Sequence, residues 1–117
     1  MRMRNQFSNL LGIAFKGGNA VVGRERVREA VQRRNAVRVF VTIDAGNALV
    51  SQIVHLCRTG STPLTRYGDK AEMGRALGRQ EVAVVALTDR GLSDALMASI
   101  EEVSSVDGSR TGKSPEE

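Results

Sequence analysis

Apolar residues recur at intervals of three and four in five stretches of the chain, the spacing that places them on one face of an α-helix. In the first stretch the stripe runs from Phe7 to Phe15, and two glycines follow where the helix should end. Asp69 is suited to cap the fourth helix, and Thr88 or Asp89 the fifth. The predicted helices cover residues 6–16, 24–34, 49–57, 70–77 and, for the last, a segment that carries residues 92–100.

Short apolar runs rich in β-branched residues separate these helices. They predict strands over residues 20–22, 37–43, 64–67 and 82–88. The second and fourth runs are almost wholly apolar, which indicates strands buried on both faces. Helices that alternate with buried strands predict an α/β fold, a three-layer α/β/α sandwich around a small four-stranded mixed sheet.

The composition predicts one globular domain. The chain has 117 residues, of which 41% are hydrophobic and 26% charged. Residues 104–117 contain too few apolar side chains to pack, so we expect a domain over residues 1–103 and a disordered C-terminal tail over 104–117.

No apolar stretch approaches the ~20 residues that a membrane-spanning helix needs, and no apolar segment with a cleavage site follows the basic N-terminus. The single cysteine, Cys57, cannot form an internal disulfide, which agrees with a reducing compartment. We therefore expect a cytoplasmic protein with no membrane partner.

Positive charge is concentrated in the first third of the chain. Residues 1–38 contain nine basic and two acidic side chains, whereas the remainder contains eight basic and eleven acidic ones. Fourteen of the seventeen basic residues are arginine, whose planar guanidinium suits bidentate contacts with phosphate. A one-sided cationic surface favours a polyanionic partner such as a nucleic acid.

Side chains that support catalysis or bind metals are sparse. His55 is the only histidine, so a zinc site would need several carboxylates. Cys57 lies two residues further along the same predicted helix and is expected to pack in the core rather than react. Residues 111–114 imitate the end of a phosphate-binding loop, but no strand precedes them. We therefore predict a protein that is not an enzyme and that needs no metal or cofactor.

A more specific pattern lies between the fourth helix and the last strand. Residues 72–78 read Glu-Met-Gly-Arg-Ala-Leu-Gly, and six apolar residues follow at 82–87. This order resembles the Glu-Leu-Gly-(Lys/Arg)-Ala-x-Gly segment of the kink-turn RNA-binding ribosomal-protein family typified by archaeal large-subunit protein L7Ae. The resemblance covers residues 10–100. Its other points are Gly23 at the start of the second helix, Asp44 at the end of a strand, Lys70 four residues before Gly74, and the turn over residues 88–91.

The resemblance implies a non-catalytic α/β/α protein that binds structured RNA. In the family, an asparagine and a glutamate on the second helix read sheared guanine–adenine pairs, and a lysine meets phosphate; the matching residues here are Glu25, Arg26 and Glu29. A carboxylate cannot donate to a base acceptor, and a guanidinium cannot accept from a guanine amino group. This substituted pattern is closer to the bacterial YlxQ-like branch, described as ribosomal or RNA-binding.

Three segments are predicted to contact RNA, with ribosomal RNA as the expected partner. The start of the second helix offers free backbone amides and arginines, the loop over residues 78–83 offers groups that stack on or bond to unpaired bases, and the glycine pair after the first helix permits close approach to phosphate. The predicted RNA-binding residues are Lys16, Gly17, Gly18, Gly23, Arg24, Glu25, Arg26, Arg28, Lys70, Arg79, Gln80, Glu81 and Val82.

Two other interpretations of the second helix stay open. Glu29 and Arg33 are four residues apart in the favourable order, which is typical of a salt-bridged, solvent-exposed face. Alternatively, the acidic side chains of Glu25 and Glu29 suit a protein-interaction module that meets a basic partner.

Overall fold

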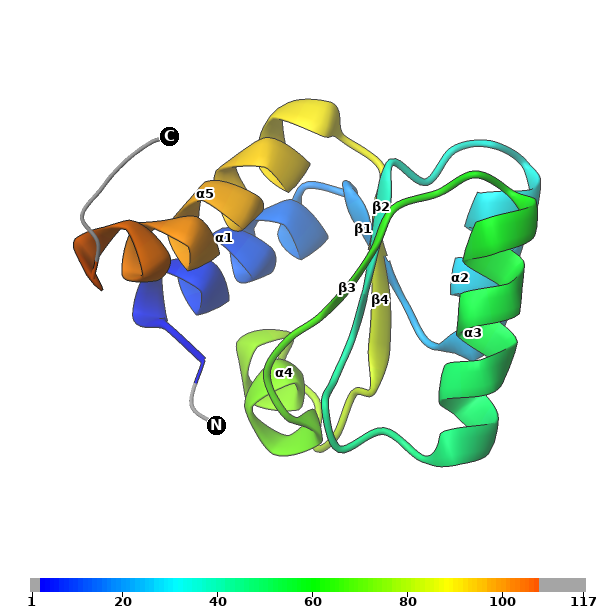
Figure 1. Ribbon diagram of the computed structural model, residues 1–117, viewed down its shortest axis with the longest axis horizontal. Helices are drawn as coiled ribbons and strands as arrows, with labels where there is room; N and C mark the ends of the chain where they lie inside the picture. The colour runs from blue at the N-terminus through cyan, green and yellow to red at the C-terminus, as the bar shows by residue number, and fades with distance from the viewer. Residues whose placement is uncertain (1–2, 108–117) are drawn as a thin grey trace.

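The computed structural model describes residues 3–107, and every helix and strand predicted from the sequence is present in this part of the chain (Figure 1). In chain order the elements are α1 (Asn5–Lys16), β1 (Ala20–Val22), α2 (Arg24–Gln32), β2 (Arg38–Val41), α3 (Asn47–Thr59), β3 (Leu64–Arg66), α4 (Lys70–Ala76), β4 (Val84–Leu87) and α5 (Arg90–Asp107). None of these helices is long and apolar enough to cross a bilayer.

The four strands form one mixed sheet in the order β1-β4-β2-β3. Strand β4 is antiparallel to both of its neighbours, whereas β2 and β3 are parallel. It follows that β1, β2 and β3 all run in one direction and that β4 runs against them. The predicted mixed sheet is confirmed.

Helices cover both faces of the sheet, as Figure 1 shows: α1, α4 and α5 lie on one side, and α2 and α3 on the other. Each strand contributes to both layers because alternate side chains point to opposite faces. The cross-strand pair Phe40 and Val85 packs under α1, while the pair Val39 and Ala86 packs under α2 and α3. The predicted three-layer α/β/α sandwich is therefore confirmed.

The predicted side-chain caps are present at two helices. The carboxylate of Asp69 accepts from the backbone N–H of Glu72 at 2.8 Å, and that of Asp89 accepts from Leu92 at 2.9 Å. Each bond satisfies one of the free amides that open a helix.

Several predicted ends need correction. Strand β2 ends at Val41, not at residue 43, and the side chain of Ile43 is 44% exposed rather than buried. Helix α5 continues to Asp107, beyond the segment of residues 92–100 predicted for it, and the domain boundary expected after residue 103 stays a prediction. Residues 108–117, the larger part of the predicted tail, lie outside the described residues.

Candidate nucleic-acid interface

The strand directions bring four connections to the same edge of the sheet. The carboxyl ends of β1, β2 and β3 and the amino end of β4 all lie there. The four connections are those at residues 23, 42–46, 67–69 and 77–83, and we call this end of the sheet the Gly23 edge. Backbone bonds tie them together, since Gly23 N–H donates to Val84 at 3.1 Å and Thr42 N–H donates to Ala83 at 2.9 Å.

Gly23 forms the whole connection between β1 and α2. Its backbone angles are φ 99° and ψ 156°, a combination that is essentially restricted to glycine. Its carbonyl accepts the first bond of the helix, from Val27 at 2.9 Å, and no side chain caps this end of α2. The first amides of α2 therefore point out at the Gly23 edge, where the positive end of the helix dipole favours an anion.

Helix α2 turns its predicted apolar stripe inward and its charged residues outward. Val27, Ala30 and Val31 are buried, as the spacing predicted, and the arginines of the helix are exposed. The charged side chains are partly paired with one another: Arg28 bonds to Glu25, and Arg33 lies 3.0 Å from Glu29.

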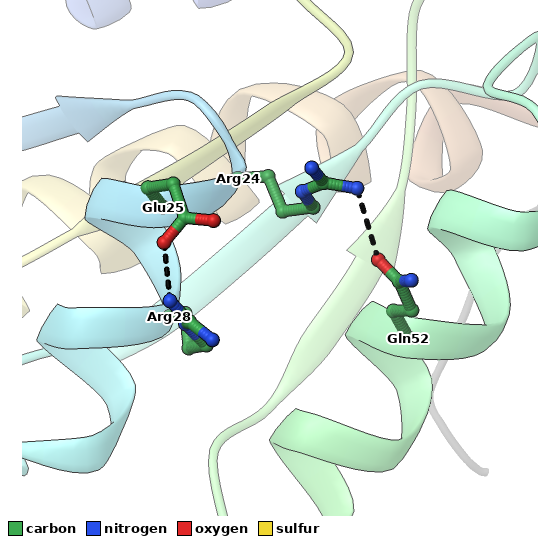
Figure 2. A network of polar contacts seen from close by, with 4 residues as sticks. All are labelled: Arg24, Glu25, Arg28 and Gln52. Carbon is green, nitrogen blue, oxygen red and sulfur yellow. Dashed lines mark hydrogen bonds and ion pairs between the residues drawn. The ribbon is translucent and has the colours of Figure 1, made fainter.

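Arg24 is held differently from the other arginines of α2. Its guanidinium reaches across to helix α3 and donates to the amide oxygen of Gln52 at 3.3 Å (Figure 2). Since Gln52 is neutral, this bond does not offset the positive charge of Arg24.

The loop between α4 and β4 is fastened to α4 through Gly74. The Gly74 carbonyl accepts from Arg79 N–H at 2.8 Å, and a Cβ at Gly74 would lie 2.6 Å from the carbonyl oxygen of Gln80. Gly78, which begins the loop, has φ 73°. Because glycine has no Cβ, Gly74 allows the loop backbone to pack directly against α4, and Gly78 allows the positive φ near the start of the loop. These two requirements account for the spacing of the glycines in the motif at residues 72–78.

Three of the predicted loop residues surround a surface hollow. Arg79, Gln80 and Glu81, together with Ala71, line a depression of about 630 Å³. The exposed guanidinium of Arg79 lies 5.6 Å from the centre of the Phe15 ring, so this arginine is directed toward α1 and away from α2.

Val82 does not belong to this exposed surface, contrary to its place among the predicted contact residues. Its side chain is only 5% exposed and lies in the core layer beneath α1. Its N–H donates to the carbonyl of Lys70 at 3.1 Å, which joins the loop to the start of α4. Val82 lies two positions before the buried strand β4 and is drawn into the core with it.

The glycine loop after α1 lies apart from the other two segments. Gly17 and Gly18 precede β1, whereas Gly23 follows it, and Asn19 accepts from Thr88 N–H at the far end of β4. Gly17 and Gly18 therefore lie at the edge of the sheet opposite Gly23, and their contact with RNA stays a prediction. Lys16 stands with Arg75 beside a groove between α1 and α4.

Three residues that were not among the predicted RNA-binding residues also lie at the Gly23 edge. Ile43 is an exposed apolar side chain in the β2–α3 connection. Arg66 donates to the carbonyls of Thr42 and Ile43, each at 3.1 Å, and so fixes that connection. Asp44 accepts from the N–H of Lys70 at 3.0 Å and thereby stabilises the start of α4. The strand-end position of Asp44 was the only one of these signals visible in the sequence.

The structure also gives the placement of the residues that the sequence raised as metal ligands or as a nucleophile. Residues 3–107 contain no group of three or more His, Cys, Asp or Glu side chains placed to hold a metal ion. Cys57 is buried, and burial raises the pKa of its thiol, which keeps it protonated at neutral pH and therefore a poor nucleophile.

The fold and the Gly23 edge place this protein in a class of small α/β/α sandwiches in which several loops converge beside the basic N-terminus of a helix. The sequence profile of the ribosomal protein L7Ae/L30e/S12e/Gadd45 family matches residues 5–97. RNA-binding protein YlxQ of Bacillus subtilis (strain 168) is 28% identical over 89 residues, which are 76% of this chain and 89% of YlxQ.

Two solved structures have the same fold. A Bacillus halodurans protein of unknown function is 30% identical and superposes with a TM-score of 0.78 over 84% of this chain and 99% of its own. The Giardia lamblia 15.5kD RNA binding protein has the same fold, with a TM-score of 0.69 at 18% identity over 90% of this chain and 93% of that one.

The chain belongs to the L7Ae/L30e/S12e/Gadd45 family. The resemblance inferred from the sequence, including its proximity to the YlxQ branch, is confirmed.

Proposed function

We propose that this chain is a non-catalytic RNA-binding protein that recognises structured, kink-turn-like RNA, with ribosomal RNA as its main partner. The observation that carries the proposal is the convergence at the Gly23 edge of an uncapped helix start, exposed arginines and a glycine-fastened loop. Membership of a family that includes RNA-binding proteins, and the similarity to YlxQ, support the same conclusion.

The charge and the shape of the proposed interface have separate roles in RNA binding. Arg24, Arg26 and Arg28 in the first two turns of α2, and Lys70 at the start of α4, supply affinity for phosphate. The hollow beside Arg79 and Gln80 receives an unpaired base, whose face stacks on the guanidinium. This division suits structured RNA. Rigid loops fit an RNA whose backbone has one fixed shape better than they fit a flexible single strand.

The alternative of a protein-interaction module that uses the acidic residues of α2 has less support. Glu25 bonds to Arg28 and Glu29 to Arg33, so both carboxylates are already neutralised. An acidic surface offered to a basic partner would have to break these pairs first.

The test is the double variant Arg24→Glu/Arg28→Glu, with affinity measured by salt-titrated gel shift against a kink-turn hairpin and folded ribosomal RNA fragments. Loss of two phosphate contacts should lower the slope of log affinity against log salt by roughly 1.4–1.8, together with a large loss of affinity. Arg58→Glu/Arg90→Glu is the matched control, since both arginines are exposed and lie away from the Gly23 edge. Equal effects in the two double variants, or none in either, would refute the proposal.

Association with ribosomes in the cytoplasm is the cellular part of the proposal. Sucrose-gradient fractionation should place the protein with ribosomal particles and release it after nuclease treatment or high salt. Co-sedimentation that survives nuclease would favour a protein partner instead.

A further inference from the structure

A groove runs along the outer layer between α2 and α3. It encloses about 710 Å³ and is lined from Arg24 and Gln52 near the Gly23 edge to Arg34 and Gly60 at the other end of the two helices. Both helices start at the Gly23 edge, so they run side by side in the same direction (Figure 1). The groove therefore connects the proposed RNA interface with the opposite edge of the sheet.

Positive charge dominates the groove. Its charged lining consists of Arg24, Arg28 and Arg34 against Glu25 alone, and Glu25 is bonded to Arg28. Figure 2 shows Arg24 of α2 reaching across to the neutral Gln52 of α3, and both residues line the groove. Within residues 3–107, neither Arg24 nor Arg34 forms an ion pair, so each end of the groove carries a guanidinium without a carboxylate partner.

Arg34 occupies a position that does not favour arginine. It follows the C-cap of α2 with φ 63°, the left-handed conformation that glycine or asparagine ordinarily adopts at this point of a helix end. Backbone strain of this kind persists only where the surrounding structure imposes it, and it occurs often at functional sites. A glycine at this position would relieve the strain, but it would also remove the guanidinium from the groove.

We propose that the α2–α3 groove is a second phosphate-binding surface, which receives the backbone of the bound RNA where it continues beyond the Gly23 edge. This inference rests on the proposed function. The groove shares Arg24 and Arg28 with the primary interface, so a strand held there reaches Arg34 without leaving the protein. His55, Gln52 and Gln32 line the groove as further polar groups for phosphate oxygens.

The test compares Arg34→Gly with Arg33→Ala, adjacent exposed arginines of which only the first lines the groove. Arg34→Gly suits the left-handed backbone, so it should fold at least as stably as the parent in urea denaturation. With a kink-turn hairpin extended by a long stem, we expect Arg34→Gly to lose roughly tenfold in affinity at low salt. Its salt slope should fall by about 0.7–0.9, and Arg33→Ala should show no change.

The outcomes separate this inference from the function on which it rests. If Arg34→Gly binds like the parent while Arg24→Glu/Arg28→Glu is impaired, the groove proposal fails and the RNA interface stands. If the parent binds none of the RNAs, both fail. If poly-glutamate binds the parent, loses affinity in Arg34→Gly, and RNA binding is unaffected, the groove accepts an acidic protein segment and the proposal is overturned.

Discussion

Gly74→Ala is the sharpest test of how the candidate interface is built, because two opposing effects decide the sign of its outcome. Gly74 lies inside α4 and is buried. Alanine in a helix interior is about 1 kcal/mol more favourable than glycine on intrinsic propensity. On that ground alone, the substitution should stabilise the protein.

Packing acts in the other direction. A Cβ at Gly74 would lie 2.6 Å from the carbonyl oxygen and 2.7 Å from the carbonyl carbon of Gln80, and 2.9 Å from the carbonyl oxygen of Arg79. These are backbone atoms, so no side-chain rotation relieves the overlap. Overpacking of this kind costs about 1–3 kcal/mol, and with rigid neighbours we expect the upper part of that range. The net expectation is a loss of roughly 1–2 kcal/mol, or a fall in Tm of about 4–16 °C for a domain of this size.

The measurement is urea and thermal unfolding of Gly74→Ala beside Gly91→Ala. Gly91 is also helical, but its added Cβ would meet Asp89 at 3.4 Å, an ordinary contact. The control should be unchanged or stabilised by up to about 1 kcal/mol. A Gly74→Ala protein as stable as its parent would show that the loop backbone yields freely. That result would refute the view that Gly74 holds the loop in shape.

Two further predictions follow from backbone geometry and burial. Gly23→Ala should destabilise the protein by about 1–3 kcal/mol in urea denaturation, since φ 99° is closed to alanine and the added Cβ meets nothing within 4 Å. The control is Gly46→Ala, since an added Cβ there also meets nothing within 4 Å but φ is −64°, and its stability should change by under about 0.5 kcal/mol. Equal losses of stability in the two variants would contradict the conclusion that the positive φ of Gly23 is the cause. Burial raises the pKa of Cys57 in the folded state, so the free energy of unfolding should decline as pH rises past the ordinary thiol pKa of about 8.5. This decline should be smaller in Cys57→Ala, and the same slope in both proteins would assign it to other groups.

The order and type of the secondary-structure elements were determined by the sequence alone. The stripe from Phe7 to Ala14 in α1 and that from Val27 to Val31 in α2 are buried as their spacing predicted. The caps at Asp69 and Asp89 were also visible. These features depend on residues within a few positions of one another, so the local pattern carries the whole signal.

The tertiary structure decided which of these elements meet. Strand directions place Gly23 and the loop after α4 at one edge and send Gly17 and Gly18 to the other, and no local pattern encodes strand order. Burial of Val82 and exposure of Ile43 depend on where each strand ends, which the pairing of neighbouring strands sets. The basic groove exists because α2 and α3 run side by side, and it brings Arg34 into line with residues far from it in sequence. Long-range packing sets the distances between these elements, so local sequence patterns do not reveal them.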